Sequence, residues 1–172
     1  TEIGRWAFEG CTSLTSIVIP SSVTEISGTT FEGCSSLTSI VVEEGNSVYD
    51  SREGCNAIIE TATNKLIRGG NSTIIPSSVT SIGANTFDGC TSLTSIVIPE
   101  SVTEIGYGAF KRCSSLTSIV VEEGNSVYDS REGCNAIINT KHGYNLLIQG
   151  CNSTIIPSSV TVIGSSAFLG CS

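Results

Sequence analysis

Charged side chains and several residue types are scarce in this sequence. Only 14 % of its 172 residues are charged, with 8 Lys and Arg against 16 Asp and Glu, and the net charge is −8. A protein that binds nucleic acid or an anionic membrane needs clustered basic residues, so we expect neither partner. No apolar run approaches the roughly 20 residues of a spanning helix, so we expect no membrane insertion by this segment. Methionine is absent and the chain begins with Thr1, so we interpret it as a segment of a longer protein, with any signal peptide or anchor outside it.

Internal repetition dominates what is present. The 26 residues at 34–59 return without change at 113–138. A catalytic site needs only one copy, so the repetition indicates architecture. We therefore interpret 1–172 as a single leucine-rich-repeat solenoid fragment made of two tandem super-repeats, at about 8–86 and 87–167.

A shorter unit recurs within each super-repeat. A phenylalanine is followed three residues later by a cysteine, and the cysteine three residues later by a leucine that opens the phrase LTSIVI or LTSIVV. Leu14 and Leu37 are 23 residues apart, as are Leu93 and Leu116. This spacing lies within the leucine-rich-repeat range of about 20–29 residues. One such coil cannot bury its apolar side alone, but stacked coils cover one another.

Two units are longer because they carry an insert. The apolar runs at 56–60 and 65–68 flank the polar residues 61–64, and 135–149 repeats this arrangement. Such a pattern is typical of a β-hairpin. The sequence therefore predicts a β-rich, curved solenoid with coils of about 23 residues, short 3₁₀ or helical turns at the Phe-x-x-Cys segments, and two hairpin inserts.

One face of the solenoid is a candidate binding surface. In LTSIVI the apolar core residues alternate with Ser16 and Val18, which should face away from the core. Repeated in every coil, this register predicts a ladder of serines beside a ladder of β-branched apolar residues. Val and Ile suit strands whichever way they point, yet an exposed apolar row is also typical of a protein-binding surface. The candidate binding face comprises Ser16, Val18, Ser39, Val41, Ser72, Ile74, Ser95, Val97, Ser118, Val120, Ser153 and Ile155.

The two hairpin inserts, at 56–68 and 135–149, differ most between the two copies. We expect them to form a wall beside the candidate binding face and to supply specificity.

The phrases C-x-S-L-T-S-I-x-I-P, S-V-T-x-I-G and A-F-x-x-C, together with the insert GNSVYDS, resemble the bacterial BspA-type leucine-rich repeats. The resemblance covers essentially the whole chain. It implies a right-handed curved solenoid in a secreted or surface-anchored protein, often one that takes part in adhesion or host-protein binding. The family has no shared catalytic residues, so the resemblance implies neither an enzyme nor a cofactor.

The eight cysteines are expected to be free thiols. Five recur three residues after a phenylalanine, where a free cysteine packs as a small hydrophobe. A bridge between Cys134 and Cys151 is an alternative, and cysteines of adjacent coils lie close enough for one, but their parallel Cβ vectors disfavour it. The five recurring cysteines are Cys11, Cys34, Cys90, Cys113 and Cys171.

No other pattern favours chemistry. His142, the only histidine, is expected in a hairpin turn. The acidic stretch 43–53 offers oxygen ligands but lacks the residue order of a calcium loop, so we expect no metal site. Asn71 and Asn152 each begin a glycosylation sequon, and their equivalent positions make inheritance through the repeat the simpler explanation.

The sequence thus favours a non-enzymatic, extracellular or cell-surface module that binds a protein or glycan ligand of a host or cell surface. The alternative is a passive spacer that projects other domains, because uniform repeats suit a spacer. Both ends of the chain lack the polar cap of a solenoid, so we also expect end-to-end self-association.

Overall fold

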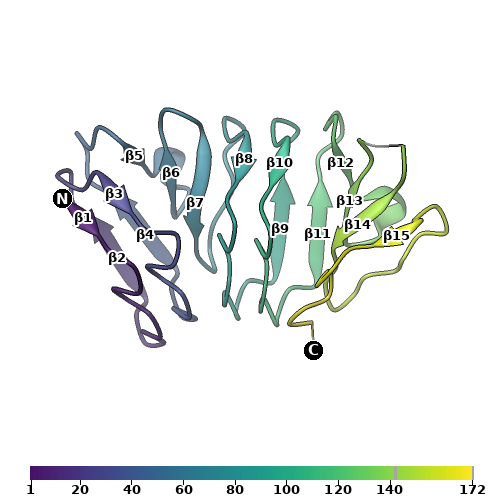
Figure 1. The fold of residues 1–172 in the computed structure, drawn as a ribbon, viewed down its shortest axis with the longest axis horizontal. Helices are drawn as coiled ribbons and strands as arrows, with labels where there is room; N and C mark the ends of the chain where they lie inside the picture. The colour runs from purple at the N-terminus through teal and green to yellow at the C-terminus, as the bar shows by residue number, and fades with distance from the viewer. Residues whose placement is uncertain (142, 172) are drawn as a thin grey trace.

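The computed structural model describes residues 1–141 and 143–171 and is a curved row of stacked coils (Figure 1). The chain follows the row from one end to the other, so residues about one coil apart in sequence are neighbours in space. Within the described residues, helix is limited to two short 3₁₀ turns. The predicted β-rich solenoid is confirmed. His142, expected in a hairpin turn, lies outside the described residues.

The SIVI phrases form the first strand of two short coils, and the SIVV phrases form the first strand of the two long coils. β2 (Ser16–Ile19) pairs in parallel with β4 (Ser39–Val42), and β9 (Ser95–Ile98) pairs in the same way with β11 (Ser118–Val121). The pairs are in register, serine to serine and valine to valine. Buried and exposed residues alternate along these strands, as a period of two requires. A proline follows β2 and β9 and ends each strand, because it has no N–H to donate.

A second row of two-residue strands comes from the V-T-E-I phrase and its equivalents. In β3 and β8 the isoleucine turns into the core and the preceding residue faces outward, whereas both residues of β15 are exposed. β1 pairs with β3, and β8 with β10, in parallel. The strands of this row are β1 (Glu2–Ile3), β3 (Glu25–Ile26), β8 (Ser81–Ile82), β10 (Glu104–Ile105) and β15 (Val162–Ile163).

The inserts are antiparallel hairpins, as predicted. In the first copy, β5 (Tyr49–Asp50) and the 3₁₀ turn η1 (Arg52–Gly54) precede β6 (Ala57–Glu60) and β7 (Lys65–Gly69). β5 pairs with β6 and β6 with β7, and β7 then pairs in parallel with β8 of the next coil. The hairpin therefore joins the second row of strands.

The second copy repeats this arrangement with one difference. β14 pairs in parallel with β15, so its hairpin also joins the second row. The sheet of the second insert therefore ends at β15, which belongs to the last coil of the chain. In the first copy, by contrast, β8 also pairs with β10. The elements of the second insert are β12 (Tyr128–Asp129), η2 (Arg131–Gly133), β13 (Ile137–Asn139) and β14 (Leu146–Gln149).

The 3₁₀ turns do not lie where the sequence predicted them. They occur in the inserts, whereas the Phe-x-x-Cys segments are hydrogen-bonded turns. In such a turn the N–H of Cys34 donates to the carbonyl of Phe31, at 3.2 Å. One bond across three residues closes each turn, but the segment is too short to continue it.

The predicted continuous ladder of first strands is wrong, because the structure interrupts it at each long coil. Residues 72–74 and 153–155 are not strands, and β2–β4 and β9–β11 are separate two-stranded sheets. The physical reason is a change of partner. The N–H of Ile74 donates to the carbonyl of Cys55, and that of Ile155 to the carbonyl of Cys134. The insert therefore takes the hydrogen bonds that a neighbouring first strand would have received.

The core lies between the two rows of strands and is filled mainly by isoleucines, leucines and phenylalanines, among them the fully buried Phe87 and Phe110. Phe8 stacks on Phe31 with ring centroids 5.3 Å apart, and Phe87 stacks on Phe110 at 5.0 Å. Each such pair contributes about 0.5–1.5 kcal/mol beyond the area it buries. The stacks are interrupted at the long coils, where the backbone of Gly69 lies against the ring of Phe87.

An asparagine fastens each insert loop to the coil before it. The side-chain amide of Asn46 donates to the carbonyls of Pro20 and Val23, while its oxygen accepts from the N–H groups of Val48 and Tyr49. Asn125 makes the same four bonds in the second copy. The G-N-S-V-Y phrase thus repeats because this asparagine satisfies backbone groups of two coils at once.

Candidate binding surface

The valines of the candidate binding face point outward on four well-formed strands. Val18, Val41, Val97 and Val120 are between 44 % and 56 % exposed. The serine two residues before each valine stands in register with the serine of the paired strand. Each strand pair therefore presents two uncharged rungs, a hydroxyl beside a branched apolar side chain.

The third rung of each super-repeat is more exposed and less regular. Ile74 is 77 % exposed and Ile155 is 75 % exposed. Between residues 73–75 and β9 lies a groove of about 350 Å³, which Ile74 and Val97 line from opposite sides. Within the described residues, no backbone hydrogen bond joins 72–76 to β9, so this edge of β9 is open. The strands of the candidate binding face are thus divided into two blocks, β2–β4 and β9–β11, instead of forming one continuous ladder.

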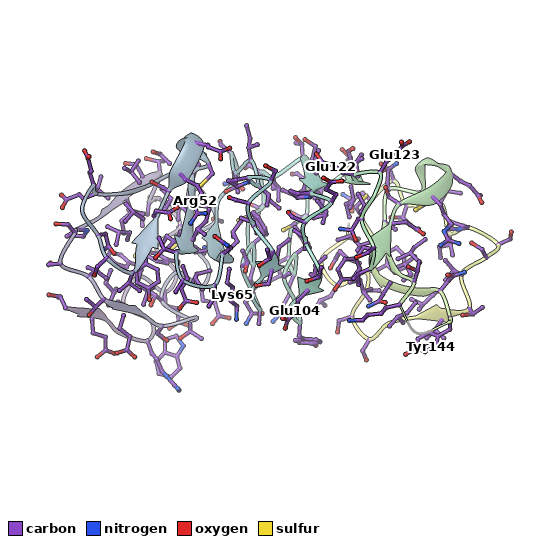
Figure 2. All side chains as sticks on the ribbon, turned by 90° about the horizontal axis from the view of Figure 1, so that it is seen from above. Arg52, Lys65, Glu104, Glu122, Glu123 and Tyr144 are labelled. Carbon is purple, nitrogen blue, oxygen red and sulfur yellow. The ribbon has the colours of Figure 1, made fainter. Side chains whose placement is uncertain are left out.

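An acidic pair directly follows the strands of the candidate binding face in both super-repeats. Glu43 and Glu44 directly follow β4, and Glu122 and Glu123 directly follow β11, all four exposed. Figure 2 shows Glu122 and Glu123 side by side at one edge of the molecule. The carboxylate of Glu122 accepts from the N–H of Glu100 at 3.1 Å and also lines the groove beside Val97. The surface therefore combines uncharged rungs with a negative edge.

The hairpins do not form the predicted wall. β7 continues the second row of strands through β8, and the start of the first insert bonds to Ile74 within the face itself. The inserts consequently divide the candidate binding face into blocks instead of flanking it.

The thiols are free, as predicted. Six of the eight are buried, while Cys11 is exposed and Cys171 is partly exposed, so the prediction of burial fails for these two. Both belong to the outermost coils, which are covered by a neighbour on one side only. The buried thiols donate to backbone carbonyls, as Cys113 does to Phe87 at 3.2 Å.

Their environment makes the buried thiols poor nucleophiles. Burial raises the pKa of Cys90 to about 11, and it also raises the pKa of Cys34, Cys55 and Cys134 above the ordinary value. A thiolate is the reactive form of cysteine, so a raised pKa suppresses attack at neutral pH.

The remaining candidates are occupied by structural contacts. In the acidic stretch, Asp50 forms an ion pair with Arg52 at 2.5 Å. Across residues 1–141 and 143–171, no group of three metal-ligating side chains is placed to hold an ion. The side-chain nitrogens of Asn71 and Asn152, the two sequon asparagines, donate to the carbonyls of Ser35 and Ser114 in a neighbouring coil. None of the helices in the described part of the chain has the length and apolarity to cross a membrane.

Comparison with known proteins agrees with this architecture. The model of the BspA type leucine rich repeat region matches residues 1–53 and 68–172, in six copies. The chain belongs to the BspA-type leucine-rich repeat family. The unmatched residues 54–67 include most of the first insert hairpin. None of the curated proteins compared with the chain matches it.

Two solved structures have the same BspA-like solenoid shape. A leucine-rich repeat protein from Eubacterium ventriosum is 25 % identical over 70 % of this chain, with a TM-score of 0.52. The pneumococcal vaccine antigen PcpA is 20 % identical over 92 % of this chain, with a TM-score of 0.60, and shows the fold alone. The chain spans 39 % and 37 % of the lengths of these two proteins.

Sequence reasoning missed two features of this surface. It considered the acidic residues only as a possible ion site. Because they directly follow the predicted strands, they also had to lie at the end of the candidate binding face. It also missed the groove beside β9. The absence of a proline after Val42 shows where the coil becomes longer. It was the sequence signal that the ladder of first strands is interrupted beyond this point.

Proposed function

We propose that this chain is a non-enzymatic adhesion module of a bacterial cell-surface protein, and that it binds an apolar protein segment flanked by basic residues. The observation that carries the proposal is the candidate binding face. Four outward valines, paired valine to valine beside a row of serines paired serine to serine, form an apolar surface without charge, and each block ends at a pair of exposed glutamates. Apolar surface supplies affinity, and the glutamates select a basic partner and speed its approach.

Surface location is supported by the family resemblance, because BspA-type repeats imply secreted or anchored proteins. An extracellular setting is also compatible with free thiols that are buried and have raised pKa values.

A passive spacer is the competing function, and the uniformity of the two super-repeats favours it. A spacer needs identical coils but no exposed apolar face. The two functions therefore differ in what happens when the valines are replaced.

The experiment is a binding screen of the chain against host matrix proteins and glycans, followed by the triple variant Val41→Lys, Val97→Lys and Val120→Lys. These side chains are exposed, so the variant should fold, which circular dichroism and thermal unfolding will verify. We expect affinity for the protein found in the screen to fall at least about tenfold, and binding to weaken with added salt.

The matched control places the same charge elsewhere, as Ser47→Lys, Thr103→Lys and Ser126→Lys, at exposed positions outside the candidate binding face. This control should bind like the wild type. Undiminished binding by the folded valine variant would show that the face is scaffold, and a screen without any binder would favour the spacer.

A further inference from the structure

A cavity of 370 Å³ lies in the second super-repeat, between the second row of strands and the second insert. One side is formed by the segment after β10, the other by β14 and the last coil. Strand pairing explains why space is left there. Among the described strands, β10 ends one sheet and β14 pairs only with β13 and β15, so no ladder closes the gap between β10 and β14. The N–H of Ile105 in β10 donates instead to the phenol oxygen of Tyr128, at 3.1 Å.

The cavity has aromatic walls and a polar rim. Phe110 and Tyr128 are buried and form its inner side, while Leu146 and Ile148 of β14 line it from the insert. Tyr107 is 69 % exposed, and its hydroxyl lies 3.2 Å from that of Ser166 in the last coil. Tyr107 is therefore an exposed aromatic side chain, and its contact with Ser166, 59 residues further along the chain, holds it at the cavity.

In the first super-repeat a buried arginine lies at the corresponding place. Arg68 stands at the position of Gln149 and is 5 % exposed. Its guanidinium donates to the carbonyls of Asn85 and Asp88, at 3.5 and 3.2 Å. The residues equivalent to these two, Ser166 and Leu169, line the cavity in the second super-repeat.

The differences between two otherwise near-identical super-repeats therefore gather around this cavity. Four charged residues of the first copy are uncharged in the second, and the position of Gly28 carries Tyr107. The pairs, first copy then second, are Glu60 and Asn139, Lys65 and Leu146, Arg68 and Gln149, and Asp88 and Leu169.

The outward side of the second row of strands also becomes less charged from the first copy to the second. In the first copy it carries Lys65 beside Ser81, and Figure 2 places Lys65 and Glu104 along the same edge of the molecule. In the second copy Leu146 pairs with Val162 at this place, and Val162 is exposed. The cavity thus opens between β10, which carries Glu104, and the apolar side chains of Leu146 and Val162.

We propose that this cavity is a binding pocket for an aromatic side chain of the partner protein, which rests on the proposed function above. Its volume lies within the range of ligand pockets, and aromatic rings stack favourably against tyrosine and phenylalanine. Aromatic side chains that fill pockets are also the residues that dominate protein interfaces. Among the described lining residues, Lys111 is the single charged side chain, which disfavours a cationic occupant.

The hydroxyls of Tyr107, Ser165 and Ser166 lie at the cavity and suit an occupant that carries its own polar group. A tyrosine side chain meets both requirements, an apolar ring and a hydroxyl that must be satisfied when buried.

The test uses N-acetyl-tyrosinamide and 4-methylphenol as probes and the full chain labelled with nitrogen-15. Three glycines line the cavity, Gly106, Gly108 and Gly164, and their amide signals report on it directly. We expect both probes to shift these signals in a saturable manner, with dissociation constants of about 1 mM.

The first super-repeat supplies the matched variant. Gln149→Arg copies Arg68, so the fold should accept it, and the new side chain should fill the cavity and weaken both probes at least about tenfold. Tyr107→Gly copies Gly28 at an exposed position and provides a second test, with an expected loss of about threefold or more.

Equal affinity of the wild type and Gln149→Arg, or shifts away from the three glycines, would overturn the proposal. Binding of 4-methylphenol without N-acetyl-tyrosinamide would overturn the assignment to a protein partner. The probe experiment does not depend on the binding screen, because the probes need no partner protein. If the probes bind but the screen finds no protein ligand, the proposed adhesion function is wrong and the cavity is an aromatic pocket without a protein partner.

Discussion

The side chain of Arg112 forms a two-point ion pair with the carboxylate of Asp88, with Nε–Oδ1 at 3.0 Å and Nη2–Oδ2 at 2.8 Å. Arg112 pays for this contact in its backbone, because its φ is +60°. Gly10, Gly33 and Gly89 hold the equivalent positions in other coils, all with positive φ. The side chain of Asp88 is only 2 % exposed, and Arg112 is its ion-pair partner.

Replacing Arg112 with glycine should destabilise the protein by up to about 2 kcal/mol. Glycine relieves about 1 kcal/mol of left-handed strain, but the unpaired buried carboxylate costs about 1–3 kcal/mol. Chemical denaturation of Arg112→Gly against the wild type measures the difference. The double variant with Asp88→Leu removes the charge and copies Leu169 of the last coil, so it should regain stability. If the single and the double variant lose the same free energy of unfolding, the ion pair contributes nothing to stability.

The features that follow from the repeat period could be predicted from the sequence. The coil length and the inward cysteines of the inner coils follow from spacing alone, and the two hairpins follow from the insert that recurs once in each super-repeat. The interrupted ladder does not follow, since Ile74 could have bonded to β4 or to the insert, and only the packed structure decides between them. The cavity at Gln149 was also out of reach, because its meaning depends on what Arg68 contacts 17–20 residues further along the chain.

Thiol reactivity should distinguish Cys11 from the other cysteines. At pH 8 a chromogenic disulfide reagent should modify one thiol rapidly in the native protein, because Cys11 is exposed. Cys171 should follow more slowly, since it is partly exposed and burial raises its pKa. All eight thiols should react after denaturation without reductant. The variant Cys11→Ser should lose the rapid phase, and fewer than eight thiols in the denatured wild type would reveal a disulfide.

Stability should fall at alkaline pH because of the buried thiols. The pKa of Cys90 is raised from 9.0 to about 11 by desolvation, so below pH 9 both the folded and the unfolded chain hold this proton. Between pH 9 and pH 11 the unfolded chain releases it first, and the free energy of unfolding decreases by about 2 kcal/mol from this group. Tyr49 and Tyr128, whose pKa values are raised by burial, extend the loss to higher pH.

The variant Cys90→Ala isolates this contribution. It should be less stable than the wild type at pH 7 because it loses buried sulfur, and the gap should narrow by about 2 kcal/mol at pH 11. Urea unfolding at several pH values under reducing conditions provides the comparison. A gap that does not change with pH would show that Cys90 ionises as easily in the folded protein as in the unfolded one.

Gly69 should tolerate no side chain, whereas Gly28 should tolerate one. A Cβ on Gly69 would overlap the ring of Phe87, which is fully buried and stacked on Phe110, so neither ring can move aside without disturbing the next coil. Overpacking of this kind costs about 1–3 kcal/mol. A Cβ on Gly28 would meet nothing within 4 Å.

Gly28→Ala is therefore the matched control, and it should leave stability unchanged or raise it by about 0.4–1 kcal/mol, because alanine restricts the unfolded chain. Gly69→Ala should lower the unfolding midpoint and broaden the ring signals of Phe87 and Phe110 in an NMR spectrum, since the overlap forces a local shift. The coil that follows the insert can stack on it only through a glycine backbone, so a Gly69→Ala protein as stable as Gly28→Ala would mean that Phe87 does not lie against this strand in solution.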